Sequence, residues 1–223
     1  MRKRLIIQAI VKFLSGVIIT AVLLFASAGT VSYPNVWLFI TVLFIPMLLL
    51  GIVMAVKFPK FLEKRLNSRE RDSEQKNVIV MGGLMFIVGF VLAGLDFRYK
   101  ITYIPKGAVI TASIIFLTAY ILYIEVMREN AYLSRTIEIQ ENQRVVDTGL
   151  YGIVRHPMYG VTIFMFLSIP IILGSIISFL IFLLYPFLIV KRIKNEELFL
   201  EKELEGYREY KQKVRYKIIP FIW

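Results

Sequence analysis

Three polar clusters near the end of the sequence contain residue types that can do chemistry. They are the loop-like stretch 140–154 (QENQRVVDTGLYGIV), the run 155–159 (RHPMY) and the segment 192–197 (RIKNEE). Proline suits the first turn of a helix, so Pro157 leaves His156 near a helix N-cap. The backbone N–H groups at such a helix start favour a carboxylate ligand.

Arg192 and Glu196 are four residues apart, so they share one face of a helix. Each candidate also has a plainer interpretation. His156 can be an interfacial helix cap, Arg155 a lipid-headgroup anchor, and Arg192 with Glu196 an ordinary surface pair of small energetic value. On the residues alone, Glu197 and the glutamates after it belong to a solvated face. We likewise expect Tyr207 and Tyr210 to be packing or interface residues.

The composition excludes several classes of site. The chain has one histidine, His156, and no cysteine, so we expect no metal site and no disulfide. Hydrophobic residues make up 57% of the chain, above the roughly 45–50% of soluble domains. This excess lies in long runs, which indicates membrane-spanning helices.

The elements that must position these clusters are read from the apolar runs. Four spans are expected at 5–28, 35–56, 78–95 and 107–127, followed by a tight helical hairpin of two short arms, 157–172 and 175–190, and a charged helix over 191–214. The predicted fold is an all-α integral membrane bundle of about five to six transmembrane segments, with a C-terminal helical hairpin and an amphipathic, cytoplasmic-side C-terminal helix. We divide it into a four-span region, 1–127, and a C-terminal region, 128–223.

Basic residues indicate the orientation of the chain. Nearly all of the 27 lysine and arginine residues fall at the N-terminus or in segments 57–76, 128–156 and 191–217. The positive-inside rule then places both termini and the polar clusters on the cytoplasmic side of the inner membrane. Because the charge has this explanation, no nucleic-acid partner is expected. The first apolar run lacks a convincing cleavage site, so we interpret it as a retained span.

The motifs in the C-terminal region resemble a known family. The run RHPMYG, an apolar hairpin, R-x-x-x-E-E and then GYREYKQKVRYKIIPFIW are similar to the isoprenylcysteine carboxyl methyltransferase (ICMT) family. That family lies within a wider group of membrane methyltransferases that includes phospholipid N-methyltransferases. The resemblance covers about residues 128–223. One departure is a glycine at 160, where the family pattern places it at 161, which here is valine; the stretch LDFRYK at 95–100 also resembles bacterial members.

The resemblance implies a site and a cofactor, S-adenosyl-L-methionine, whose product is S-adenosyl-L-homocysteine. The implied cofactor contacts are Gln140, Gln143, Arg144, Val145, Val146, Leu150, Tyr151, His156, Pro157, Met158, Tyr159, Glu196 and Glu197. Arg192 would face the substrate carboxylate, Glu196 would close the cofactor site and Arg155 would support it. The substrate would be a lipophilic small molecule that enters from the bilayer, and membrane lipids would be further partners.

The residues suit this chemistry. A carboxylate acceptor is ionised at pH 7, so it needs alignment rather than a general base. An amine acceptor would have to lose a proton, and Glu196 or His156 would then be the candidate base. Two alternatives remain open: a membrane reductase of the sterol-reductase type that uses NADPH, and a non-catalytic transporter or scaffold. The predicted spans carry few ionisable residues away from their ends, which argues against a transporter.

Overall fold

The computed structural model describes residues 2–66, 73–134 and 139–223. Three arginines of the basic segments, Arg69, Arg71 and Arg135, lie outside these ranges. In the described part of the chain the regular structure is helical, and five helices are long and apolar enough to cross a membrane. The chain is a multi-pass membrane protein, as the sequence predicted.

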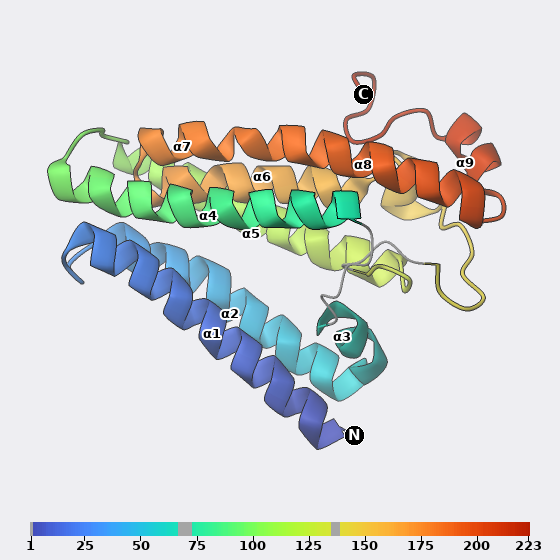
Figure 1. Ribbon diagram of the computed structural model, residues 1–223, viewed down its shortest axis with the longest axis horizontal. Helices are drawn as coiled ribbons and strands as arrows, with labels where there is room; N and C mark the ends of the chain where they lie inside the picture. The colour runs from blue at the N-terminus through green and yellow to red at the C-terminus, as the bar shows by residue number, and fades with distance from the viewer. Residues whose placement is uncertain (1, 67–72, 135–138) are drawn as a thin grey trace.

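The first four predicted spans are present with longer bounds. They are α1 (Arg2–Ala28), α2 (Pro34–Lys57), α4 (Ser73–Tyr99) and α5 (Lys106–Glu129). The helix α2 runs through Pro46 without ending there. A short amphipathic helix, α3 (Pro59–Leu66), was not predicted, and it follows α2 at the end of the bundle where the chain termini also lie (Figure 1).

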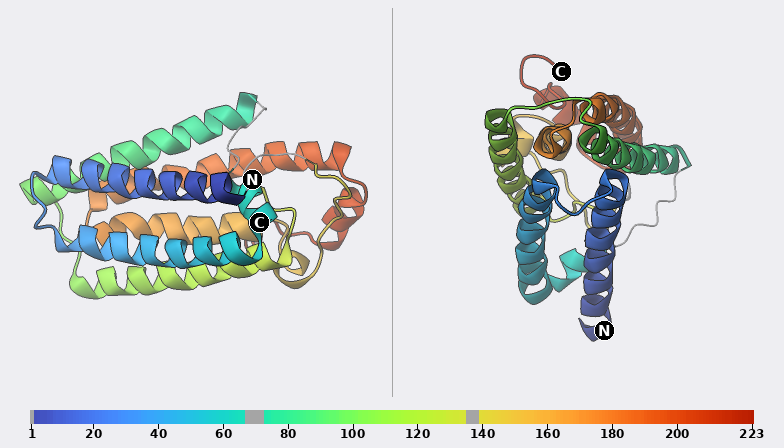
Figure 2. Two further views of the ribbon diagram at one scale, coloured as in Figure 1. Left: turned by 90° about the horizontal axis from the view of Figure 1, so that it is seen from below. Right: turned by 90° about the vertical axis from the view of Figure 1, so that its left-hand side faces the viewer.

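The helices form two groups. Figure 1 shows α4, α5, α6 (Pro157–Leu173), α7 (Ile176–Phe182) and α8 (Leu184–Glu203) running together along the long axis, while α1 and α2 lean away from them toward the end that carries α3. The right-hand view in Figure 2 shows the same separation. The groups meet where α1 contacts α4 and α2 contacts α5 and α6.

The predicted hairpin turn between α6 and α7 is confirmed, and it is a buried turn. Gly174 adopts φ 83°, a left-handed conformation that glycine permits at the end of a helix. The amide of Asn35 donates to the carbonyl of Ile172 at 2.9 Å, and the hydroxyl of Ser175 donates to the carboxylate of Asp96 at 2.5 Å. These bonds supply the polar partners that a turn away from water requires.

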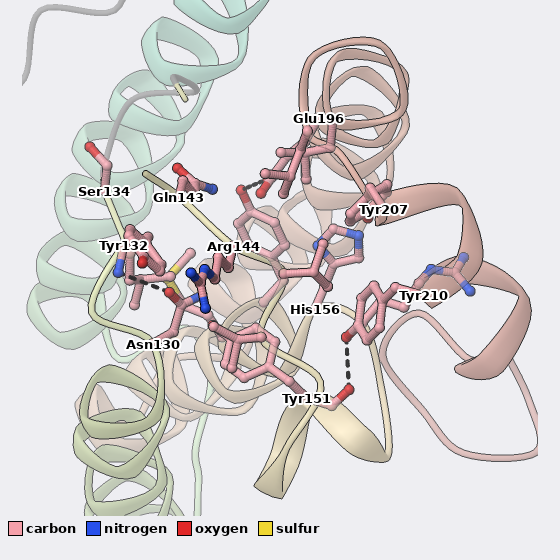
Figure 3. A pocket seen from close by; sticks show the side chains of 18 of the residues that line it. Asn130, Tyr132, Ser134, Gln143, Arg144, Tyr151, His156, Glu196, Tyr207 and Tyr210 are labelled. Carbon is pink, nitrogen blue, oxygen red and sulfur yellow. Dashed lines mark hydrogen bonds between the residues drawn. The ribbon is translucent and has the colours of Figure 1, made fainter. Parts of the chain in front are cut away.

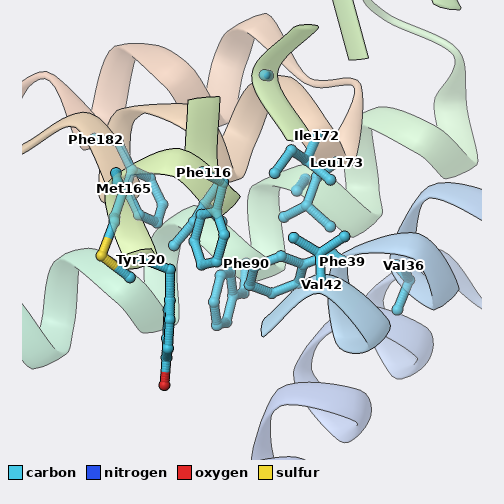
Figure 4. Close-up of a cluster of buried hydrophobic side chains, with 14 of the residues drawn as sticks. Val36, Phe39, Val42, Phe90, Phe116, Tyr120, Met165, Ile172, Leu173 and Phe182 are labelled. Atoms are coloured by element: carbon cyan, nitrogen blue, oxygen red, sulfur yellow. The ribbon is translucent and has the colours of Figure 1, made fainter. Parts of the chain in front are cut away.

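The core lies between the two helix groups and is rich in aromatic side chains. Figure 4 shows Phe39, Phe90, Phe116 and Phe182 meeting within it, and each is at most 6% exposed. In a membrane, helix association depends on close packing because lipid is as apolar as the side chains. Gly89 provides such a contact, since a Cβ there would lie 2.4 Å from the ring of Phe182. Gly89 is therefore a packing position.

The charged stretch 191–214 differs from the single surface helix that we expected. Its first part continues the second arm of the hairpin as α8, and only Tyr207–Lys213 forms a separate short helix, α9. The reason is local: no glycine or proline occurs between Pro186 and Gly206, so the helix continues from its apolar half into its charged half. At Gly206, with φ 81°, the chain reverses.

Candidate functional site

The N-terminal end of α6 is held by the C-terminal tail. The backbone N–H of Arg155 donates to the carbonyl of Tyr216 at 2.9 Å, and that of His156 donates to the carbonyl of Lys217 at 2.8 Å. Gly160 allows the tail to come close, because a Cβ at this position would lie 3.0 Å from a methyl group of Ile218. The displaced glycine of the sequence motif therefore has a packing role.

A buried charged network joins α8, α6 and the tail. Nε of Arg155 donates to Oε1 of Glu197 at 2.7 Å, and Nε2 of His156 lies 3.2 Å from the same oxygen. Nζ of Lys217 lies 3.2 Å from the other oxygen, Oε2. The Arg155 guanidinium also donates to the carbonyls of Val214 and Arg215. The interpretation of Glu197 as a solvated residue is therefore wrong, because the folded tail covers it and it is only 4% exposed.

Tyr159 connects the two charged residues that the sequence placed on one helix face. Its hydroxyl donates to Oε2 of Glu196 at 2.5 Å and accepts a hydrogen bond from Nε of Arg192 at 2.7 Å. Tyr159 comes from α6, whereas Arg192 and Glu196 are on α8. The bonds therefore fix the start of α6 against the charged half of α8, with a cation and an anion on either side of one phenol.

These side chains line a pocket at the end of the bundle (Figure 3). The pocket is lined by Asn130, Tyr132, Leu133, Ser134, Gln143, Arg144, Val145, Val146, Tyr151, Arg155, His156, Met158, Tyr159, Arg192, Glu196, Leu200, Leu204, Tyr207 and Tyr210. The three polar clusters of the sequence therefore meet around one cavity, in which most of the predicted site residues take part.

Four of the predicted site residues do not line this pocket. Glu197 lies behind it in the network with Arg155. Leu150 and Pro157 line an apolar groove beside α5 and α6 instead. The side chain of Gln140 is used within the protein, because its amide nitrogen donates to the carbonyl of Tyr132 at 2.6 Å and its amide oxygen accepts from Lys64 of α3. Gln140 thus ties the loop to α3.

Several lining residues were missed. They are Asn130, Tyr132, Leu133 and Ser134 after α5, and Leu200, Leu204, Tyr207 and Tyr210 around the end of α8 and α9. The amphipathic pattern of the last segment includes Leu204 and Tyr207 among its apolar positions. Such a pattern does not distinguish residues that face lipid from residues that face the core or a cavity. The four residues after α5 gave no comparable signal.

The tyrosines outside the spans remain protonated hydrogen-bond donors. Burial raises the pKa of Tyr151, Tyr207 and Tyr210 well above the usual value for a phenol, and nearby carboxylates raise the pKa of Tyr207 further. The hydroxyl of Tyr210 donates to the backbone carbonyl of Tyr151 at 2.7 Å (Figure 3). Among the described residues, no group of three or more metal-ligating side chains occurs. The pocket is lined by charged and aromatic side chains, which suit an organic ligand with both charged and aromatic parts.

The fold and this site define a multi-pass helical membrane protein with a polar pocket that is built by the end of α5, the start of α6, α8 and α9. Residues 109–202, from α5 to near the end of α8, match the model of the isoprenylcysteine carboxyl methyltransferase (ICMT) family. The match confirms the resemblance seen in the motifs for the part of the chain that it covers. The chain is also similar to the Delta(14)-sterol reductase TM7SF2 of Mus musculus, with 31% identity over 91 residues. That alignment covers 40% of this chain and 22% of the reductase, so the chain spans about a fifth of this relative.

Proposed function

We propose that this protein transfers the methyl group of S-adenosyl-L-methionine to a lipophilic acceptor, a carboxylate of the isoprenylcysteine or isoprenoid type. The observation that carries the proposal is the contact of Tyr159 with both Arg192 and Glu196 at the pocket. This contact joins the guanidinium of Arg192, which can bind a carboxylate, and the carboxylate of Glu196 at the same pocket. The family match over residues 109–202 supports the same reaction.

The pocket residues fit the proposed cofactor by the chemistry of their groups. Glu196 supplies a negative charge, Tyr151 and Tyr210 supply aromatic faces, and Asn130 and Gln143 supply amide donors and acceptors. When bound, the cofactor supplies an electrophilic methyl group on a positively charged sulfur. We assign Gln143, Arg144, Val145, Val146, Tyr151, His156, Met158, Tyr159 and Glu196 to its binding.

Arg192 is the proposed carboxylate-binding residue. A guanidinium can present two parallel N–H groups to a carboxylate, which fixes the direction of the attacking oxygen. Tyr159 holds Nε of Arg192 in place, and Glu196 offsets the positive charge of the bound sulfonium. An acceptor carboxylate held by Arg192 would take the methyl group directly from the sulfonium, which would leave as a neutral thioether, so no residue of the protein would have to move a proton. Alignment of the acceptor and the cofactor in the pocket is then the main contribution of the protein.

The buried network behind the pocket has a positioning role. Arg155 and Glu197 fix the segment before α6 to α8 and the tail, and they hold His156 at the pocket wall. The proposal keeps the division into a four-span region, 1–127, and a methyltransferase-like region, 128–223. It also keeps the orientation with the pocket and both termini at the cytoplasmic face of the inner membrane, because the basic residues gather at that end.

Calorimetric titration of S-adenosyl-L-homocysteine into detergent-purified protein tests the cofactor. Wild-type protein should bind it, Glu196→Ala and His156→Ala should weaken binding, and Lys194→Ala, an exposed change on the same helix, should not. Unchanged binding in both site variants would remove the site assignment. Titration of NADPH tests the reductase alternative, which the similarity to a sterol reductase favours. Binding of NADPH without binding of S-adenosyl-L-homocysteine would overturn the proposal.

Methyl transfer from labelled cofactor then identifies the acceptor. A prenylated cysteine with a free carboxylate should be methylated, and the same compound with its carboxylate esterified should not. A lipid amine offered in parallel is the competing acceptor. Transfer to the amine alone would show that the carboxylate assignment, and with it the role of Arg192, is wrong.

A further inference from the structure

Tyr207 is a pocket residue whose placement is fixed by its neighbours. It is the first residue of α9, directly after the reversal at Gly206, and it is only 4% exposed. The centroid of its ring lies 5.7 Å from that of Tyr210 (Figure 3). The cluster that these two tyrosines form with Val214 packs against Val145, Leu200 and Leu204.

The anchors of α9 prevent this ring from turning away. The hydroxyl of Tyr210 is bonded to the carbonyl of Tyr151, and Nζ of Lys213 lies 2.6 Å from a carboxylate oxygen of Asp147. Both bonds tie α9 to the loop that forms the opposite wall of the pocket. Tyr207 is held between these contacts and the chain reversal at Gly206.

The hydroxyl of Tyr207 has no hydrogen-bond partner within the part of the chain that the structure describes. The neighbouring pocket tyrosines differ, because the hydroxyls of Tyr159 and Tyr210 are both bonded to protein groups. Buried polar groups in native proteins are almost always paired, and an exception calls for a partner such as water or a ligand. Because Tyr207 is one of the residues that line the pocket, a bound ligand can supply that partner.

The surroundings define which kind of partner it takes. Burial and the carboxylates of Glu197 and Glu196 raise the pKa of Tyr207, so the phenol keeps its proton and offers it as a donor. The partner must therefore be an acceptor atom. The cluster that contains Tyr207 also packs against Val145, which lies in the stretch that the proposed function assigns to the cofactor.

Building on the proposed function, we infer that the hydroxyl of Tyr207 donates a hydrogen bond to an acceptor atom of the bound S-adenosyl cofactor. The contact makes Tyr207 a cofactor-affinity residue, not merely a packing residue. It also gives α9, which lies beyond the residues that the family model matches, a direct part in ligand binding.

The test compares Tyr207→Phe with Tyr210→Phe in detergent-purified full-length protein. Each variant removes one hydroxyl and keeps the ring. For Tyr207→Phe we expect binding of S-adenosyl-L-homocysteine to weaken about 5- to 10-fold, as for loss of one net hydrogen bond. The melting temperature of the unliganded protein should be unchanged or higher, because no protein contact is lost. For Tyr210→Phe the unliganded melting temperature should fall, because the bond to Tyr151 is removed.

The outcomes separate this inference from the proposed function. Wild-type affinity in Tyr207→Phe would overturn the inference and leave the cofactor proposal intact. A fall in unliganded melting temperature as large as that of Tyr210→Phe would also overturn it, because the hydroxyl would then serve the fold. Absence of binding by the wild-type protein would instead count against the proposed function.

Discussion

Nε of Arg155 lies 2.7 Å from Oε1 of Glu197, and the two side chains are only 3% and 5% exposed. The pair joins residues that are 42 positions apart in the sequence, and it is shared with His156 and Lys217. Charged groups this deeply buried are tolerated only when their partners are present. The pocket wall around His156 therefore depends on this ion pair.

Glu197→Ala should destabilise the protein strongly. Removing one partner of a buried pair leaves an uncompensated charge, at a cost of about 3–5 kcal/mol. Thermal unfolding in detergent should show a large fall in melting temperature. Glu201→Ala is the matched control on the same helix. Glu201 pairs with Lys211 and both side chains are partly exposed, so this variant should lose far less stability. Equal losses in the two variants would contradict this assignment.

Arg192→Ala should separate catalysis from cofactor binding. If Arg192 holds the acceptor carboxylate, its loss should lower methyl transfer by about 100-fold or more, as when a group that aligns or stabilises reacting charge is removed. Affinity for S-adenosyl-L-homocysteine should stay close to that of the wild-type protein. Kinetic assays and calorimetry on the same preparation measure both quantities, with Lys194→Ala as the control. A parallel loss of both quantities would show that Arg192 belongs to the cofactor site.

The sequence was sufficient for the spans because long apolar runs leave a helix as the only stable structure in lipid. It also located the pocket on the correct segments, since 140–159 and 192–197 carried polar groups where a membrane protein has few. The short helix α3 escaped prediction because its eight residues are amphipathic and lie in a basic loop. A pattern of that length does not separate a helix from a connection.

The different surroundings of the adjacent residues Glu196 and Glu197 could not be predicted from their residue type. Successive helical residues point about 100° apart, so Glu196 and Glu197 must face different surroundings. The surroundings of Glu197 are made by the returning tail, with Lys217 beside it, and that contact is not encoded locally. The same limit applies to Tyr207. The amphipathic pattern of the last segment could be read from the sequence, but the pocket that Tyr207 lines could not.

Gly89→Ala should weaken the packing of α4 against α7. The added methyl group would lie 2.4 Å from the ring of Phe182, which is fully buried and cannot move aside freely. Overpacking of this kind costs about 1–3 kcal/mol. Gly82→Ala on the same helix is the matched control, because among the described residues nothing lies within 4 Å of a Cβ at that position. Melting temperatures should fall for the first variant and stay unchanged or rise for the second.

High pH should destabilise the protein through its buried tyrosines. Burial raises the pKa of Tyr151, Tyr207 and Tyr210 in the folded state, whereas in the unfolded chain a tyrosine titrates near its reference pKa of about 10. The folded protein therefore keeps protons that the unfolded chain releases. This contribution to stability is complete below about pH 10 and is lost progressively as the pH rises from there toward the folded pKa values.

The measurement is a series of melting temperatures from about pH 8 to about pH 11, the range that brackets the reference pKa of tyrosine. The wild-type protein should lose stability at the upper end of this range. Tyr207→Phe should lose less over the same interval, because one of the buried phenols is gone, although its melting temperature at neutral pH should match or exceed that of the wild type. If the two curves ran parallel, the phenol of Tyr207 would ionise as readily in the folded protein as in the unfolded chain, and its burial beside the two glutamates would be contradicted.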